Sequence, residues 1–244
     1  MAKIDLKSIS GLPITYENDE ILFKDFTYRE KVSITIDDIR EQLLNQSLDC
    51  PEIFYDIYKY VDFNSIFKEK NVRVNIYLVK ANIAGVEYVK TKALRCKKYS
   101  KIIEVFAGTG TILLQKYRSP KDNQVIKISV KKGSKVIIPA EYDFVAVNTR
   151  LNAPFIFAEY CFYGAISRIV LDESNGMAYY VIRKNAKQEI VRNSSYKIVN
   201  EPEKTDMDRL ITTYGITPKT PVAKQILRKY EKFEWLFKEN SVSI

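Results

Sequence analysis

The sequence predicts a mainly β protein whose strands form an antiparallel sandwich or barrel. From Asn71 onward, apolar and polar residues alternate, as they do in strands with one buried face. Short segments of this kind follow one another up to Arg183, separated by turn-forming residues. Of the 244 residues, 46% are hydrophobic and 28% charged, a balance that is typical of globular proteins and excludes wholesale disorder.

The N-terminal part predicts strands and one helix. Residues 13–25 predict two strands joined by the turn ENDE. Residues 34–46 predict a helix, because Asp37 and Asp38 lie at its start and apolar residues recur on one face after them. The aromatic-rich stretch 52–63 fits either a strand or a helix.

The central part predicts a series of short strands with turns between them. The predicted strands are residues 72–78, 86–91, 102–106, 111–117, 125–130, 136–139, 144–148, 155–162, 166–172 and 177–183. Gly108-Thr109-Gly110 indicates a turn or bulge, and residues 119–123 indicate a loop. The pair Asn175-Gly176 predicts a hairpin between the last two strands.

The composition changes near residue 200, which suggests a barrel domain over 1–200 and an appendage over 201–244. Residues 201–220 are polar and proline-containing, as expected of a linker, and residues 221–239 predict an amphipathic helix. Its apolar stripe is formed by Ala223, Ile226, Leu227, Tyr230, Phe233 and Phe237. We expect this stripe to pack on the barrel or on a second subunit, rather than to serve nucleic-acid or membrane binding.

Charge favours anionic partners, since 39 Lys and Arg against 30 Asp and Glu give a net charge of +9. Phosphorylated metabolites, nucleic acid and membrane surfaces are the classes to consider. The densest basic cluster is Lys90, Lys92, Arg95, Lys97, Lys98 and Lys101. It predicts either a solvated basic face or an anion site.

The chain has no histidine, which removes the commonest general base, the commonest zinc ligand and every Ser-His or Cys-His nucleophile. The longest run without a charged residue, 105–115, is much shorter than the roughly 20 residues of a membrane-spanning helix. The N-terminus has no apolar stretch of signal-peptide length. With three cysteines, we expect reduced thiols and a cytoplasmic protein that does not associate with membranes.

The segment with the most specific spacing is 133–148, GSKVIIPAEYDFVAVN. It resembles the second sequence motif of the cupin superfamily. Three positions match that motif at the required spacing: Gly133, Pro139 and Asn148. Glu141 stands at the second glycine of the motif and Phe144 at its histidine. Upstream, GTGTILLQ at 108–115 resembles the Gly-x-Gly hairpin that closes the first cupin motif.

Over residues 12–195 the pattern resembles one cupin subfamily, the archaeal cupin-type glucose-6-phosphate isomerases. Beyond the two motifs, the matching segments include GVEYVKTK at 85–92 and PFIFAEY at 154–160. The resemblance implies a single cupin barrel, which is a jelly roll, with an N-terminal strand–helix extension. It also implies a homodimer.

The resemblance further implies a divalent metal held by three histidines and one glutamate, which serves proton transfer in the isomerases. Here the family stretch Thr-Lys-Gly-His-x-His reads Thr-Lys-Ala-Leu-Arg-Cys at 91–96. Leu94, Cys96 and Phe144 therefore stand at the three histidine positions. Leucine and phenylalanine cannot coordinate a hard divalent ion, so we predict no metal and no cofactor.

The family glutamate has two candidate positions. Counting back from Gly108 gives Lys101, whereas the Glu-Val-aromatic triplet gives Glu104. Because side chains alternate across a strand, the odd offset places these two residues on opposite faces, and only one can face the cavity. Both remain candidate catalytic residues.

Several residues are candidates for binding a ligand. By resemblance, Thr91 and Lys92 match the segment that contacts phosphate in the family, and Tyr160 matches a family tyrosine. The remaining candidate lining residues are Tyr88, Phe106, Tyr142 and Phe144. The alternative for the aromatic residues is that they fill the barrel.

Three functions compete. The first is a catalytically degenerate cupin that binds a sugar phosphate or another small anion without a metal. The second is a metal-independent isomerase, with Glu104 as base and Lys101 or Lys92 polarising the carbonyl. The third is an interaction or nucleic-acid-binding protein that uses the basic C-terminal helix.

Overall fold

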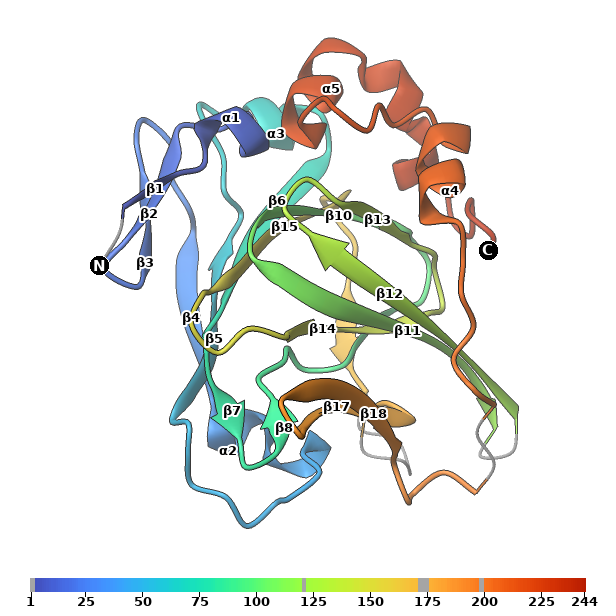
Figure 1. Ribbon diagram of the computed structural model, residues 1–244. Coiled ribbons are helices and arrows are strands. Elements are labelled where there is room, and N and C mark those ends of the chain that lie inside the picture. Colours follow the sequence, from blue (N-terminus) through green and yellow to red (C-terminus); the bar gives the residue numbers. More distant parts are fainter. Residues whose placement is uncertain (1–2, 120–121, 171–175, 198–199) are drawn as a thin grey trace.

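The computed structural model describes residues 3–119, 122–170, 176–197 and 200–244, and its centre is a pair of facing β-sheets (Figure 1). Eight strands form this centre: β6 (Val72–Val79), β9 (Leu94–Cys96), β10 (Lys101–Ala107), β11 (Thr109–Ser119), β12 (Asp122–Lys131), β13 (Lys135–Ile138), β14 (Asp143–Asn148) and β15 (Phe155–Phe162). The predicted loop at 119–123 falls partly on residues 120–121, outside the described residues.

The strand order is that of a jelly roll. One sheet runs β13-β10-β15-β6 and the other β12-β11-β14-β9, with antiparallel neighbours in both. Strands that follow one another in sequence mostly lie in opposite sheets, so the chain winds around one interior. The prediction of a mainly β protein with a cupin-type jelly roll is confirmed.

The glycines of the GTG segment are required by close backbone approach. A Cβ on Gly108 would lie 2.4 Å from the carbonyl oxygen of Pro154, and one on Gly110 would lie 2.5 Å from that of Val147. No real Cβ tolerates such contacts, so the sharp passage from β10 to β11 depends on these two residues. Glu141, at the motif glycine, has φ of +67°, a conformation in which glycine is favoured.

An N-terminal extension flanks the barrel. Strands β1 (Ile4–Asp5), β2 (Ile14–Glu17) and β3 (Glu20–Phe23) form a separate sheet, with helix α1 (Lys7–Ser10) between the first two. Strands β4 (Glu30–Thr35) and β5 (Ile53–Lys59) extend the larger barrel sheet beyond β6. The ambiguous stretch 52–63 is therefore largely a strand.

The helix predicted over 34–46 is shorter than expected. It consists of α2 (Ile36–Ile39) and a 3-10 turn, η1 (Arg40–Gln42), after which Leu43 is extended. The Gln42 side chain accepts a hydrogen bond from the Ala93 amide and donates one to the Val170 carbonyl. These tertiary bonds hold Gln42 against the barrel, where a continuing helix would not place it.

The hairpin predicted at Asn175-Gly176 is wrong. Strand β16 (Ser167–Ile169) pairs with β9, whereas β17 (Tyr179–Lys184) pairs with β18 (Lys187–Arg192) and with β8 (Glu87–Tyr88). Residues 171–175 lie outside the described residues. The hairpin is instead β17–β18, where Asn185 and Ala186 both have positive φ, as a tight hairpin turn requires. With β7 (Ile83–Ala84), these strands complete a four-stranded sheet.

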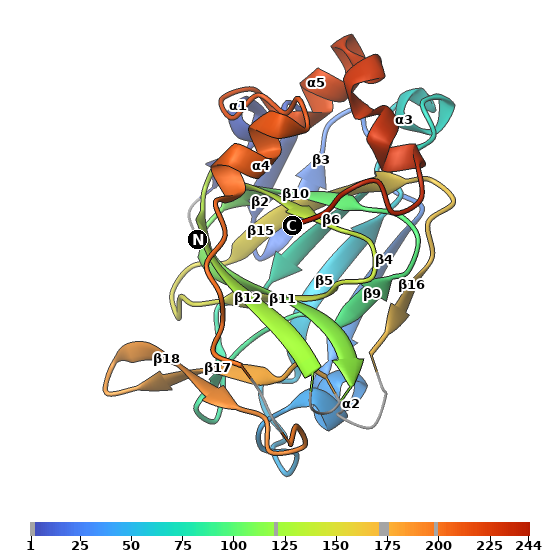
Figure 2. The same cartoon turned by 90° about the vertical axis from the view of Figure 1, so that its right-hand side faces the viewer.

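The C-terminal segment lies over the larger sheet, on the side opposite the β17–β18 hairpin (Figures 1 and 2). It contains α4 (Met207–Thr213), α5 (Val222–Arg228) and a 3-10 helix, η2 (Tyr230–Phe237), with the short helix α3 (Ile66–Glu69) nearby. The predicted continuous helix 221–239 is therefore broken at Lys229. In η2 the repeat is three residues, so Phe233 and Leu236 become the buried positions.

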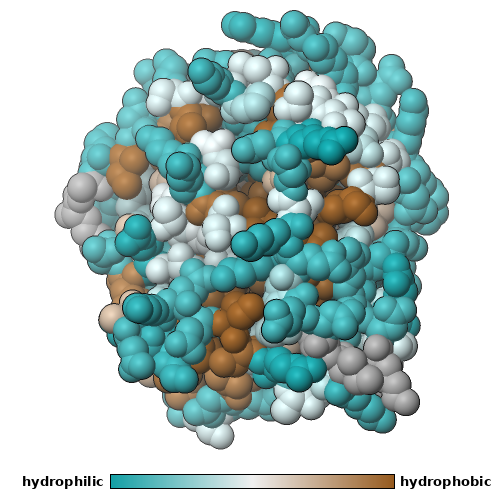
Figure 3. All heavy atoms as spheres, turned by 45° about the vertical axis from the view of Figure 1, so that its right-hand side comes forward, coloured by the Kyte–Doolittle hydropathy of each residue, from teal (hydrophilic) through white to brown (hydrophobic). Residues whose placement is uncertain are grey.

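This segment is part of the barrel's hydrophobic core. The residues that join the main core cluster are Met207, Ile211, Ile216, Val222, Ala223, Ile226, Phe233, Leu236 and Val242. The expectation that the helix packs on its own barrel is confirmed. On the face shown in Figure 3, apolar residues form separate patches between hydrophilic side chains. Among the described helices, none has the length and apolar character needed to cross a membrane.

Candidate functional site

The two candidate catalytic residues lie on opposite faces of β10, as their odd spacing requires. Lys101 points between the two sheets, because its ammonium lies 5.1 Å from the ring of Phe144 on the facing sheet. Glu104 points away from the barrel interior, toward the C-terminal segment, where its carboxylate contacts the Val222 amide. The structure does not bring Lys101 and Glu104 together.

Lys101 forms a buried ion pair inside the barrel. Its Nζ lies 2.6 Å from Oε2 of Glu159 on β15 and 2.8 Å from the Ser167 hydroxyl. The second oxygen of Glu159 accepts a hydrogen bond of 3.1 Å from the side-chain amide of Asn75 on β6. Both charged side chains are almost fully buried. Three strands therefore hold one ion pair at one of the two positions that the resemblance offers for the family glutamate.

The charges around Glu159 keep its carboxyl group ionised. Burial alone would raise its pKa, but Lys101 and Arg73 outweigh burial and lower the pKa below its usual value. The neighbouring Cys161 thiol responds in the other direction, because burial raises its pKa to about 12. Cys161 is therefore a protonated thiol at neutral pH and not an activated nucleophile.

Glu104 belongs to a second buried polar cluster, outside the barrel interior. Its carboxylate lies 3.1 Å from the ammonium of Lys135 on β13 and accepts hydrogen bonds from the Val222 amide at 3.0 Å and the Tyr160 hydroxyl at 3.3 Å. Lys135 also donates to the Pro218 carbonyl at 2.6 Å. Burial raises the pKa of Glu104 to about 7, opposed mainly by Lys135. This cluster joins the barrel to the C-terminal segment.

The predicted ligand-binding residues are dispersed. Thr91 is fully buried and its hydroxyl accepts a hydrogen bond from the Ala146 amide, while Lys92 forms an ion pair with Asp38 at 3.4 Å. Tyr88 packs in the cluster beneath the β17–β18 hairpin.

The aromatic candidates also lie in different environments. Tyr142 donates a hydrogen bond to Gln124, and Phe106 is buried in the main core. Phe144 lies beside Lys101, and Tyr160 beside Glu104.

The basic cluster predicted from the sequence is largely neutralised. Lys90 is paired with Glu87, Arg95 with Asp143, Lys92 with Asp38 and Lys101 with Glu159, while the exposed Lys98 contacts Glu239. Lys97 has no carboxylate partner among the described residues. The cluster is thus partly structural, and only its exposed members are available to an external anion.

A pocket lies at one end of the barrel, where β9 leads into β10 and β15 into β16. Its volume is about 260 Å³. Its lining residues are Arg95, Cys96, Lys97, Lys98, Tyr99, Gly164, Ile166 and Arg168. Four of these eight residues are cations, and the other four give it an apolar wall. We call it the barrel-end pocket; it could hold the anionic group of a small molecule at its basic rim.

The residues that the resemblance places at the family's metal position do not fit a divalent ion. Leu94 and Phe144 offer no donor atoms, and the nearby carboxylate of Glu159 is already paired with Lys101. Cys96 packs in a small apolar cluster with Cys161 and Ala165. Within the described ranges, no group of three Cys, Asp or Glu side chains could hold a metal. No reaction step through a metal follows from this donor set.

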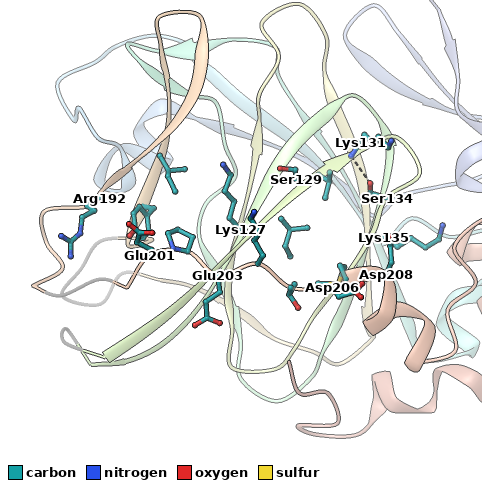
Figure 4. A pocket seen from close by; sticks show the side chains of 18 residues that line it. Lys127, Ser129, Lys131, Ser134, Lys135, Arg192, Glu201, Glu203, Asp206 and Asp208 are labelled. Atoms are coloured by element: carbon teal, nitrogen blue, oxygen red, sulfur yellow. Dashed lines mark hydrogen bonds between the residues drawn. The ribbon is translucent and has the colours of Figure 1, made fainter.

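A larger groove of about 1120 Å³ runs along β12 and the segment 201–208 (Figure 4). Its walls carry both signs of charge. The cations include Lys127, Lys131 and Arg192, and the acids include Glu201 and Glu203. The segment 201–208 is held to the edge of β12 by backbone hydrogen bonds at Glu203. Mixed charge gives this groove no preference for an anion.

Sequence reasoning missed Glu159, Lys135 and Arg168. Glu159 lies in the otherwise apolar run PFIFAEYCF, and a carboxylate in the middle of a buried strand was a signal for a charge partner. Lys135 follows the Gly133 turn and has no distinguishing pattern. Arg168 becomes relevant only through the fold, which pairs β16 with β9.

Comparison with known proteins agrees with the sequence resemblance. A family model described as glucose-6-phosphate isomerase matches residues 29–199, well over half of the chain. Among curated protein sequences, none matches significantly.

Solved structures give only partial similarities. A cysteine peptidase from Thevetia peruviana latex, Peruvianin-I, is 17% identical with a TM-score of 0.33, over 41% of this chain and 56% of that one. An oxalate decarboxylase mutant from Bacillus subtilis is 12% identical with a TM-score of 0.38, over 48% and 28%. A salicylate 1,2-dioxygenase from Pseudaminobacter salicylatoxidans is 11% identical with a TM-score of 0.34, over 48% and 30%. The chain thus spans between about a quarter and just over half of these proteins.

Proposed function

The chain belongs to the glucose-6-phosphate isomerase family, and on this premise we propose that it is a metal-independent member that binds a small anion and does not isomerise it. The observation that carries the proposal is the Lys101–Glu159 pair beside Phe144. A fixed ammonium at this position repels a divalent cation, and both oxygens of its partner carboxylate already accept hydrogen bonds, from Lys101 and Asn75. The barrel interior is held together by side chains where the isomerases hold a metal.

The barrel-end pocket supports the binding half of this proposal. It lies next to Cys96, at one of the family's metal-ligand positions, and carries Lys97 and Arg168 without carboxylate partners among the described residues. Such cations form charge-assisted hydrogen bonds with phosphate or carboxylate oxygens. A sugar phosphate, or another small anion with an apolar portion against Ile166, is the proposed ligand class.

The isomerase alternative has less support from the geometry. Glu104 would act as base, and its raised pKa suits that role. However, its side chain is fully buried beneath α5 and faces away from Lys101, so no substrate reaches both groups. The interaction or nucleic-acid alternative relied on the C-terminal helix, whose apolar stripe packs on the barrel.

The experiment measures Tm and calorimetric binding with glucose 6-phosphate, fructose 6-phosphate and inorganic phosphate. A ligand at ten times its Kd stabilises the protein by about 1.4 kcal/mol, which raises Tm by roughly 3–5 °C for a chain of this size. The double variant Lys97→Met/Arg168→Met alters two exposed side chains, and it should lose calorimetric binding at the barrel-end pocket and show a smaller Tm shift. Lys187→Met, an exposed cation that lines neither this pocket nor another cleft at the N-terminal extension, should retain it.

A coupled enzyme assay of the same protein tests the second part of the proposal, that the bound sugar phosphate is not isomerised. We expect no conversion of glucose 6-phosphate to fructose 6-phosphate, with or without added divalent metal. Conversion that disappears in Glu104→Gln would establish the isomerase alternative. Stoichiometric metal in the purified protein would contradict the account of Lys101.

A further inference from the structure

A second cleft lies outside the barrel, between the N-terminal extension and the ends of β5 and β6. Its volume is about 190 Å³. Its lining residues are Thr27, Tyr28, Arg29, Tyr60, Val61, Asp62, Lys68, Val72, Arg73, Val74 and Tyr163. Three of these are cations and one is an acid. This cleft shares no lining residue with the barrel-end pocket.

The acid of the cleft is committed to backbone groups. One oxygen of Asp62 accepts hydrogen bonds from the backbone amides of Phe63 and Phe67, and the other accepts one from the backbone amide of Lys68. These bonds hold the start of α3. Asp62 therefore contributes one negative charge to the cleft but makes no ion pair with Arg29, Lys68 or Arg73 within the described ranges.

Arg73 has no carboxylate within ion-pair distance among the described residues, unlike most of the partly or fully buried cations. Those that have such a partner include Lys80, Lys90, Lys92, Arg95, Lys101 and Lys135. Arg73 donates a hydrogen bond of 2.7 Å to the Ala165 carbonyl, and its buried Nε has no hydrogen-bond partner among the described residues. Glu159 attracts Arg73 electrostatically, yet its oxygens are bonded to Lys101 and Asn75. A buried donor left unpaired is costly, which indicates a missing acceptor.

The Tyr60 ring lies near both guanidinium groups that line the cleft. It lies 4.2 Å from the Arg29 guanidinium carbon and 5.7 Å from that of Arg73. Arg29 also donates a hydrogen bond to the Tyr163 hydroxyl at 3.2 Å. Tyr60 itself has φ of +54°, a strained conformation for a bulky residue, which is held by a hydrogen bond from its amide to the Asn75 side chain. Such strain concentrates at ligand sites.

We propose that this cleft binds the phosphate group of a small phosphate monoester, with Arg73 and Arg29 as its two cationic donors. The exposed Arg29 guanidinium and the cleft-lining guanidinium of Arg73 each donate hydrogen bonds to phosphate oxygens, and a dianion neutralises both arginines. The Tyr163 hydroxyl is a further donor. A volume of about 190 Å³ admits the phosphate and leaves the remainder of the ligand outside, against Tyr28 and Tyr60.

Inorganic phosphate is the first probe, and the resonances of arginine Nε–H groups in 15N-labelled full-length protein are the readout. At constant ionic strength we expect saturable shifts of the Arg73 and Arg29 signals in the low millimolar range, with no such shifts in chloride. Arg29→Met, which changes an exposed side chain, should weaken phosphate binding at this site at least fivefold. Arg73→Lys should weaken it similarly, because lysine lacks the planar fork.

The variant Lys97→Met/Arg168→Met separates this site from the barrel-end pocket. If it binds phosphate at Arg73 as the wild type does, the two sites are distinct, as proposed. The proposal is overturned if the Arg73 signal does not move, if it moves equally in chloride, or if Arg29→Met binds with unchanged affinity. Loss of all phosphate binding in the Lys97/Arg168 variant alone would assign the anion to the barrel-end pocket instead. Phenyl phosphate against phenol then tests whether the monoester, rather than its organic part, is recognised.

Discussion

Replacing Glu104 with glutamine changes how the stability of the protein depends on pH. In the folded protein the pKa of Glu104 is about 7, against an ordinary value of 4.5. Between these values the folded state keeps a proton that the unfolded state has released. Stability is therefore fullest below pH 4.5 and falls as the pH rises toward 7. The contribution lost across this window is about 3 kcal/mol.

Glutamine keeps the shape and the acceptor oxygen for the Val222 amide but cannot ionise. The free energy of unfolding of the wild type minus that of Glu104→Gln should therefore fall by about 3 kcal/mol between pH 4.5 and 8. Taking the difference removes the contributions of other carboxyls, including Glu159, whose lowered pKa acts with the opposite sign. Urea unfolding, followed by circular dichroism at half-unit steps of pH, measures both proteins.

Glu239→Gln is the matched control, because Glu239 is exposed and its contact with Lys98 is at the surface. The same difference curve for this surface variant supplies the baseline for the Glu104→Gln curve. A flat curve for Glu104→Gln, or one that rises with pH, would refute the reasoning that burial outweighs Lys135 at this site.

Three further predictions concern stability and domain organisation. Lys101→Met should destabilise the protein by about 3–5 kcal/mol because it leaves Glu159 charged and buried, whereas Lys101→Met/Glu159→Gln should recover most of this loss in urea unfolding. An additive double variant would show that the two residues do not form a pair. Glu141→Gly should raise stability by roughly 0.5–1 kcal/mol, since φ of +67° favours glycine, and Glu141→Ala should give no such gain. A chain that ends at residue 200 should lack cooperative thermal unfolding, because it lacks the part of the core that α5 and η2 supply; a cooperative transition in that fragment would support the division into 1–200 and 201–244.

The alternation of apolar and polar residues predicted most of the barrel strands. Segments such as β10, which ends before Gly108, and β14, which lies a few residues after Pro139, contain β-branched residues, so their limits could be predicted within one or two residues. Alternation also required Lys101 and Glu104 to lie on opposite faces, although it could not decide which faced inward. That depends on what covers each face of the sheet, which is information from distant segments.

The predictions that were wrong also depended on contacts with segments distant in the sequence. Asn175-Gly176 has the local chemistry of a hairpin, but the flanking strands find better partners in β9 and β18. The prediction for 221–239 assumed a single α-helix with one apolar stripe. In the structure the helix breaks at Lys229, and a 3-10 helix with a three-residue repeat follows. The Lys101–Glu159 pair joins positions 58 residues apart, and no local pattern relates them.

The contacts of Glu104 with the Val222 amide and of Lys135 with the Pro218 carbonyl have a consequence for biosynthesis. Both charges belong to strands that are translated before the backbone groups that cover them. Until residues 218–236 have left the ribosome, the nascent barrel exposes this charged and partly apolar face of the sheet. A polypeptide that has been translated only as far as the barrel strands is therefore a form that needs chaperones.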